Sequence, residues 1–287
     1  MSLTGILVKG FGSFYTVSTD EGEIEARARG RLKGTKERLY IGDRVVLEKE
    51  QETYAITDVL ERKNCIIRPA VANVDQIVVV IAAASPDPNY KQTDKLLTFL
   101  EYSGLDVSIC INKADLENCE EIKETYEKAG YKVIITSTTK EEGLENLKEL
   151  LKDKITAFAG CSGVGKSSLI NAINREFIQK TGEVGKIERG RHTTTHASLL
   201  PLDFGGYIID TPGFSVVDIT KIEKQELTNY FREFNEYSHE CRFVGCTHKN
   251  AADCKVMEMV EKGVISENRY KSYLELFEEL SSINRYK

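Results

Sequence analysis

Residues 160–167 read Gly-Cys-Ser-Gly-Val-Gly-Lys-Ser and stand between an apolar run, 155–159, and a helical pattern that begins at Lys166. This is the complete phosphate-loop pattern in the strand-to-helix setting that it requires. Its glycines allow backbone N–H groups to surround a phosphate, and the helix N-terminus adds the positive end of its dipole. A glycine-rich turn with a chance lysine is the alternative, and the flanking pattern disfavours it. The loop therefore predicts an α/β domain that binds a nucleoside polyphosphate.

Two side chains of this loop have chemical roles. Lys166 is expected to reach the β and γ phosphates, and the Ser167 hydroxyl to ligate Mg²⁺. We expect the nucleotide to contact the whole segment: Gly160, Cys161, Ser162, Gly163, Val164, Gly165, Lys166, Ser167 and Ser168. Because these residues touch only phosphates, the base must be recognised elsewhere.

The candidate for base recognition follows the apolar run 107–111 and consists of Asn112, Lys113, Ala114 and Asp115. A carboxylate at Asp115 can accept two hydrogen bonds from the N1–H and the exocyclic amine of guanine, a donor pair that adenine lacks. Ser137 and Thr138, after the run 133–136, are expected to give a backbone contact to the guanine oxygen. Alone, the tetrapeptide could be a helix-capping loop. Together with the phosphate loop it predicts GTP and opposes an ATP-driven nucleic-acid motor.

A sensor for the γ-phosphate is predicted where Asp210-Thr211-Pro212-Gly213 ends another apolar strand. Asp210 would hold magnesium through water, and the Gly213 N–H would contact the phosphate. Upstream, residues 190–195 read Gly-Arg-His-Thr-Thr-Thr and offer a threonine as a second magnesium ligand in a switch region.

The residue after this sensor is Phe214, where Ras-like enzymes have a glutamine that orients the attacking water. A phenyl ring cannot hydrogen-bond water. Our hypothesis is that His192 in the switch positions the water or that a partner completes the site, so unaided hydrolysis should be slow. A merely structural or solvent-exposed His192 is the alternative.

The motifs run in an unusual order, because Asn-Lys-x-Asp precedes the phosphate loop. The same sheet can form if the usual termini are joined and the chain is reopened after the sensor, since compact domains tolerate permutation at exposed sites. The chain then passes from the γ-phosphate sensor directly into the C-terminal region.

A metal site is predicted by the pattern Cys241-x4-Cys246-x-His248-x5-Cys254. Three thiolates and one imidazole form a tetrahedral set closed to water, which is typical of one structural zinc. Cysteines in a small core are the alternative, disfavoured because the region is short and polar. The odd total of 7 cysteines also suits a reducing compartment better than a disulfide framework.

The first 70 residues contain five short β-segments, at 5–8, 14–19, 23–28, 44–48 and 54–59, which predict a small barrel of the OB-fold type. Arg27, Arg29, Arg31 and Lys33 alternate there and would share one strand face as a phosphate-contacting strip. A solvated edge strand protected by charge is the alternative. The net charge of -6 argues against indiscriminate coating of nucleic acid, so such a contact must be local.

We therefore expect a multidomain chain: an OB-fold RNA-binding barrel at 1–70, a circularly permuted P-loop GTPase α/β domain at 71–222 and a helical zinc-binding domain at 223–287. The longest apolar run, 77–84, is much shorter than the roughly 20 residues of a membrane span, and no apolar leader opens the sequence. We expect a cytoplasmic protein, monomeric when free.

With these motifs in place, the chain resembles the bacterial ribosome small subunit-dependent GTPase A family over all 287 residues. The resemblance implies a checkpoint factor in late maturation of the small ribosomal subunit, stimulated by that subunit, with the barrel and zinc module contacting ribosomal RNA. It also implies that Thr194 is the switch ligand of magnesium and favours His192 as the catalytic residue. The main rival is an RNA-binding scaffold that holds GTP as a structural ligand and hydrolyses little.

Overall fold

The computed structural model describes residues 2–29, 38–66, 70–174, 197–210 and 218–283. The chain divides into two compact units. The first comprises Met1–Gln76, Leu150–Ala157 and Asn174–Phe214, and the second comprises Ile77–Glu149, Phe158–Ile173 and Ser215–Lys287. Each unit is described below by itself.

The N-terminal strands form the predicted five-stranded barrel. They are β1 (Ser2–Phe11), β2 (Phe14–Thr19), β3 (Gly22–Ala28), β4 (Arg44–Glu50) and β5 (Thr53–Val59). The barrel closes in the order β1-β2-β3-β5-β4, because β1 pairs antiparallel with both β2 and β4 while β3 and β5 pair in parallel. Side chains that alternate along the strands fill its interior, among them the fully buried Leu7, Val17, Leu47 and Ile56.

The basic strip predicted on the third strand is described only in part. Arg27 lies over the Phe14 ring at 4.5 Å, and Arg29 forms ion pairs with Glu48, at 3.6 Å, and with Glu50. Arg31 and Lys33 lie outside the described residues. The strip as a phosphate-contacting surface therefore stays a prediction.

The predicted α/β sheet is present and has six strands. They are β8 (Gln76–Ala82), β9 (Val107–Asn112), β10 (Lys132–Ile135), β11 (Ile155–Ala159), β12 (Ser198–Pro201) and β13 (Tyr207–Asp210), in the order β10-β9-β8-β11-β13-β12. β8, β9 and β10 pair in parallel, as do β11 and β13, while β12 is antiparallel to β13. All seven residues of β8 are buried, as a strand covered on both faces requires. A short hairpin, β6 (Cys65–Ile66) and β7 (Val71–Ala72), precedes the sheet.

The turn between β12 and β13 is a hairpin with two consecutive glycines. Gly205 and Gly206 have φ values of +94° and +91°, which side chains rarely adopt. A Cβ at Gly206 would lie 2.7 Å from the Lys154 carbonyl oxygen, so space as well as backbone conformation requires glycine here.

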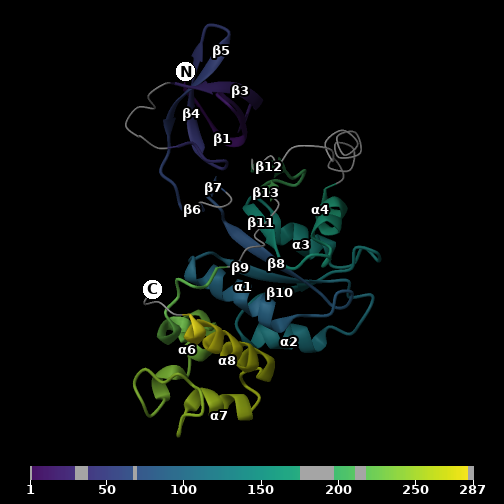
Figure 1. Ribbon diagram of the computed structural model, residues 1–287. Coiled ribbons are helices and arrows are strands. Elements are labelled where there is room, and N and C mark those ends of the chain that lie inside the picture. The colour runs from purple at the N-terminus through teal and green to yellow at the C-terminus, as the bar shows by residue number, and fades with distance from the viewer. Residues whose placement is uncertain (1, 30–37, 67–69, 175–196, 211–217, 284–287) are drawn as a thin grey trace. The chain divides into compact units, whose positions relative to one another are not determined.

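The second unit carries most of the helices. The helices that follow strands of the sheet are α1 (Tyr90–Tyr102), α2 (Glu120–Lys128), α3 (Leu144–Leu151) and α4 (Lys166–Ile173). The C-terminal region contains α6 (Arg232–Asn235), α7 (Lys255–Glu261) and α8 (Glu267–Ser282). It also contains two 3₁₀ turns, η1 (Lys224–Tyr230) and η2 (Ser238–Glu240). Helix α8 runs alongside α1 (Figure 1). Ser266 precedes α8, as expected for an N-cap residue, but its hydroxyl lies 3.2 Å from Thr125 Oγ1 and makes no capping hydrogen bond.

A buried ion cluster joins α8 and α6 to α1. The Arg269 guanidinium donates to Asp94 at 2.6 Å and to Glu233 at 2.7 and 3.2 Å, and its Cζ lies 4.4 Å from the centre of the Phe231 ring. Arg269 and Asp94 have no exposed surface. Because removal of one partner would leave an uncompensated buried charge, this cluster constrains how the C-terminal helices pack on α1.

No helix within the described ranges is both long and apolar enough to cross a lipid bilayer.

Candidate nucleotide and metal sites

Asn112 joins the base-recognition tetrapeptide to the phosphate loop. It ends β9 and is fully buried, and its Nδ2 donates to the Val164 carbonyl at 3.1 Å. Its Oδ1 accepts a hydrogen bond from the Thr136 hydroxyl at 3.2 Å, which ties the same side chain to the end of β10. One amide thus holds together three segments predicted to surround a nucleotide, although the chain visits them in permuted order.

The phosphate loop needs its glycines for both conformation and space. Gly160, Gly163 and Gly165 have φ values of +132°, +82° and +96°. A Cβ would lie 2.3 Å from the Val80 carbonyl oxygen at Gly160, and 2.3 Å from Asn112 Nδ2 at Gly165. The loop therefore packs its backbone directly on β8 and on Asn112.

The side-chain ammonium of Lys166 lies against the backbone of the phosphate loop. Lys166 Nζ donates to the Gly160 and Cys161 carbonyls at 2.8 and 2.7 Å, and burial lowers the pKa of this ammonium. Ser167 and Ser168, in the first turn of α4, are exposed. The loop thus presents an ammonium and two hydroxyls at a helix N-terminus, where a polyphosphate is favourable.

The Asp115 carboxylate is hydrogen-bonded to Ser137, which follows strand β10. Ser137 Oγ donates to this carboxylate at 2.5 Å, and this hydrogen bond is the main cause of a pKa below the ordinary value. Ser137 itself is buried and accepts from the Lys140 N–H at 3.1 Å, and the Ala114 N–H donates to the Thr136 carbonyl at 3.2 Å. Asp115 is therefore oriented and ionised, ready to accept hydrogen bonds.

Of the predicted γ-phosphate sensor and switch region, only Asp210 lies within the described residues. It ends β13 in the first unit, and the parallel pairing of β13 with β11 points the carboxyl ends of both strands the same way. His192, Thr194, Gly213 and Phe214 lie outside the described residues, and their roles stay predictions.

The four predicted metal ligands converge in the second unit. The ligand atoms of Cys241, Cys246, His248 and Cys254 all lie within 4.8 Å of one another. His248 Nδ1 lies 3.6 Å from Cys241 Sγ and 3.4 Å from Cys254 Sγ, and these two sulfurs are 3.9 Å apart. Four soft or borderline donors around one point form a ligand set suited to a metal ion.

The protonation of the cluster also fits a metal. Burial lowers the pKa of His248 to about 4, so its ring is neutral at pH 7 with a lone pair available on one nitrogen. Burial raises the pKa of the Cys254 thiol to about 12. Clustered sulfurs in such surroundings become thiolates only when a cation compensates them, which is what a bound metal ion provides.

Helix α8 holds the loop of metal ligands through two hydrogen bonds. Tyr270 and Tyr273 donate their hydroxyls to the carbonyls of His248, at 2.7 Å, and Thr247, at 2.9 Å. The Phe234 ring meets the His248 ring edge to face at 5.8 Å. The metal ligands are therefore continuous with the hydrophobic core of the C-terminal helices.

Comparison with known proteins agrees with this geometry. The family description "RsgA GTPase" matches residues 59–220, more than half of the chain, and "RsgA N-terminal domain" matches residues 4–56. The chain belongs to the RsgA GTPase family. Its nucleotide site is therefore that of a circularly permuted GTPase.

Individual RsgA relatives match over nearly full length. The chain is 48% identical over 284 residues to a protein of Caldanaerobacter subterraneus subsp. tengcongensis named small ribosomal subunit biogenesis GTPase RsgA, covering 97% of this chain and 96% of that protein. A protein of the same name from Thermotoga petrophila is 43% identical, with 96% of each chain covered.

Two solved structures share the fold. YjeQ from Thermotoga maritima aligns with a TM-score of 0.81 and 37% identity, covering 99% of this chain and all of the other. YloQ, described as a circularly permuted GTPase, aligns with a TM-score of 0.82 and 33% identity, covering 100% of this chain and 98% of the other.

In this RsgA-family chain, several residues of the site have contacts that motif spacing could not indicate. Lys113 Nζ donates to the Gly163 carbonyl at 2.7 Å and to the Ser85 carbonyl, so the lysine holds the loop next to the bond made by Asn112. The Cys161 thiol lies 3.2 Å from Gln92 Oε1 of α1. No motif includes Gln92, and only the folded chain brings it to the loop.

Gly165→Ala is expected to weaken GTP binding by about 100-fold, because the new Cβ must displace the Asn112 amide that holds the loop. Fluorescent-nucleotide titration measures the effect. Gly104→Ala is the matched control, since Gly104 also has positive φ, +65°, but nothing lies within 4 Å of its would-be Cβ. Equal GTP affinity in the Gly165 variant and the wild type would contradict the close packing of loop and amide.

Proposed function

We propose that this chain is a GTPase of late small-subunit maturation: it binds ribosomal RNA, and the small ribosomal subunit stimulates it to hydrolyse GTP to GDP and phosphate. The observation that supports the proposal is the Asn112 side chain, because its amide donates to the Val164 carbonyl of the phosphate loop from the strand end that leads into Asp115, as one shared nucleotide would require. The RsgA relatives are named small ribosomal subunit biogenesis GTPases, and these names suggest the small ribosomal subunit as the assembly on which this GTPase acts.

The same proposal assigns parts of the chain to tasks: residues 1–70 bind RNA, 71–222 bind and hydrolyse GTP, and 223–287 form a zinc module. We propose one structural zinc, since three cysteines and one histidine leave no open coordination position. Magnesium would accompany GTP, held by Ser167 and Thr194 directly and by Asp210 through water. The protein would act in the cytoplasm and be monomeric when free.

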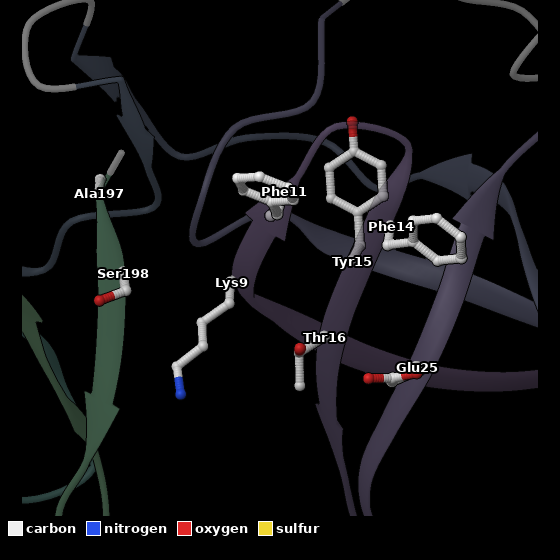
Figure 2. Close-up of a pocket in the computed structure, with 9 residues that line it drawn as sticks. Lys9, Phe11, Phe14, Tyr15, Thr16, Glu25, Ala197 and Ser198 are labelled. Atoms are coloured by element: carbon white, nitrogen blue, oxygen red, sulfur yellow. The ribbon is translucent and has the colours of Figure 1, made fainter. Parts of the chain in front are cut away.

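The barrel offers a surface that supports RNA binding. The lining of a hollow of about 350 Å³ includes Lys9, Phe11, Phe14 and Tyr15 of the barrel, together with Glu25 and with Ser198 of β12, and Phe11 is exposed over 77% of its surface. Figure 2 shows the three rings grouped at one end of this hollow, with the Lys9 side chain below them. Exposed aromatic faces beside cations are the chemistry on which unpaired bases stack.

In the proposed reaction the protein's groups act mainly by position and charge. Backbone N–H groups of the phosphate loop and Lys166 would stabilise negative charge on the transferred phosphoryl group, and the magnesium ion would neutralise the β and γ oxygens. Asp115, already ionised, would accept the guanine donors. His192 is proposed to orient the attacking water, because Phe214 cannot.

The test is GTP turnover with and without purified small subunits, together with co-sedimentation under GTP, GDP and a non-hydrolysable analogue. We expect large acceleration by the subunit and binding that depends on the γ-phosphate. Binding without acceleration would instead support the alternative, an RNA-binding scaffold with GTP as a structural or regulatory ligand.

His192→Ala is expected to lower subunit-stimulated turnover by about 100-fold, the scale of losing one positioned proton-handling or water-orienting group. GTP affinity and subunit binding should stay within about twofold of wild type, since the imidazole acts only on the water. His239→Ala is the control, because His239 is exposed beside the metal cluster and outside its ligand set. Undiminished stimulated hydrolysis would refute the role of His192.

A further inference from the structure

The loop between the first two metal ligands carries two exposed apolar side chains at its tip. Phe243 is 53% exposed and Val244 is fully exposed, and we call these two residues the metal-loop tip. Val244 is the most exposed large hydrophobic side chain among the described residues. Exposure of adjacent apolar side chains to water is unfavourable, and contiguous exposure of this kind is typical of an interaction site.

The tip is held in place rather than suspended on a loose loop. Cys241 and Cys246, its two ends, belong to the ligand cluster. Arg242 adds two bonds to Asp253, since its N–H donates to the Asp253 carbonyl at 3.4 Å and its guanidinium to the carboxylate at 2.7 Å. A preorganised tip loses little conformational freedom when a partner covers it, which favours binding.

The charges around the tip oppose a nucleic-acid partner. Residues 236–262 contain four Lys and Arg against five Asp and Glu. Each of these four cations forms an ion pair with a carboxylate: Arg242 with Asp253, Lys249 with Glu278, Lys255 with Glu240 and Glu258, and Lys262 with Glu258. RNA binding depends on cations that can neutralise phosphates, and here carboxylates outnumber the local cations and lie within ion-pair distance of each of them.

We propose that the metal-loop tip docks into an apolar pocket on a protein of the small ribosomal subunit, and not on its RNA. The inference rests on the proposed function, because it takes the subunit as the partner. It differs from the expectation, drawn from family resemblance, that the zinc module contacts ribosomal RNA. In this arrangement the barrel supplies the RNA contact, and Phe243 with Val244 supplies a small apolar anchor, whose aromatic ring is of a type enriched in protein interfaces.

The first experiment measures subunit affinity of the double variant Phe243→Ser, Val244→Ser by co-sedimentation. We expect binding at least about tenfold weaker than wild type, with unchanged metal content and GTP affinity showing that the fold is intact. Val264→Ser is the matched control, since Val264 is 42% exposed in the same C-terminal region but lies outside the ligand segment 241–254 in the sequence. Wild-type affinity in the double variant would overturn the proposal.

The second experiment identifies the partner. Val244→p-benzoylphenylalanine places a photocrosslinker at the tip, and the crosslinked product with purified subunits is analysed by mass spectrometry. A crosslink to a subunit protein supports the proposal, whereas a crosslink to ribosomal RNA, or none despite binding, overturns it. If the wild type itself fails to bind subunits, the proposed function fails instead, so the two failures are distinguishable.

Discussion

Asp115→Asn is expected to reduce GTP affinity by about 100-fold or more while raising affinity for xanthosine triphosphate. The asparagine amide turns a donor toward the exocyclic amine of guanine, so the guanine donor pair loses its acceptor. Xanthine carries a carbonyl at that position, which the new amide can satisfy. Competitive displacement of a fluorescent nucleotide by GTP, XTP and ATP measures all three affinities.

The control for this exchange is Asp106→Asn, an exposed carboxylate just before β9. It makes the same change in charge and should leave the nucleotide affinities as in wild type. If Asp115→Asn kept the GTP preference, the assignment of the base site to residues 112–115 would be wrong. Ser137→Ala should weaken GTP binding less, because it removes only the group that orients the Asp115 carboxylate.

Loss of the metal is expected to unfold the C-terminal region in both chelated wild type and Cys254→Ser. Metal binding contributes about 10 kcal/mol or more to the folding of small zinc modules. Without it, the buried Cys254 thiol, whose pKa burial raises, and the buried His248 Nε2, which has no hydrogen-bond partner, remain at the site. Elemental analysis should find one zinc in the wild type, and limited proteolysis should cut residues 218–283 only after metal removal.

Cys65→Ser is the matched control, since Cys65 is an exposed cysteine outside the ligand cluster. It should retain the metal and the protease resistance of the wild type. Addition of zinc to the chelated wild type should restore resistance, whereas Cys254→Ser should not recover. A purified wild type without bound metal would contradict the zinc assignment.

The sequence alone determined those features whose physical cause is local. A phosphate loop needs glycines at set positions because its N–H groups must converge, and their spacing is visible in the chain. A tetrahedral metal site needs four donors within a short segment, and residues 241–254 display them. Alternating and continuous apolar runs likewise predicted the barrel strands and the sheet, because side-chain periodicity follows from strand geometry.

The tertiary structure decided which distant residues pair. Arg269 and Asp94 are 175 positions apart, and Cys161 and Gln92 are 69 apart, so no local propensity could join them. Ser266 illustrates the same limit, since its hydroxyl meets Thr125, 141 positions away, instead of capping α8. A buried polar group forms hydrogen bonds with the partners that the packing of the chain brings near it, and this packing depends on the whole fold. For that reason the sequence predicted the chemistry of the nucleotide site, while only the fold showed Asn112 and Lys113 holding the phosphate loop in place.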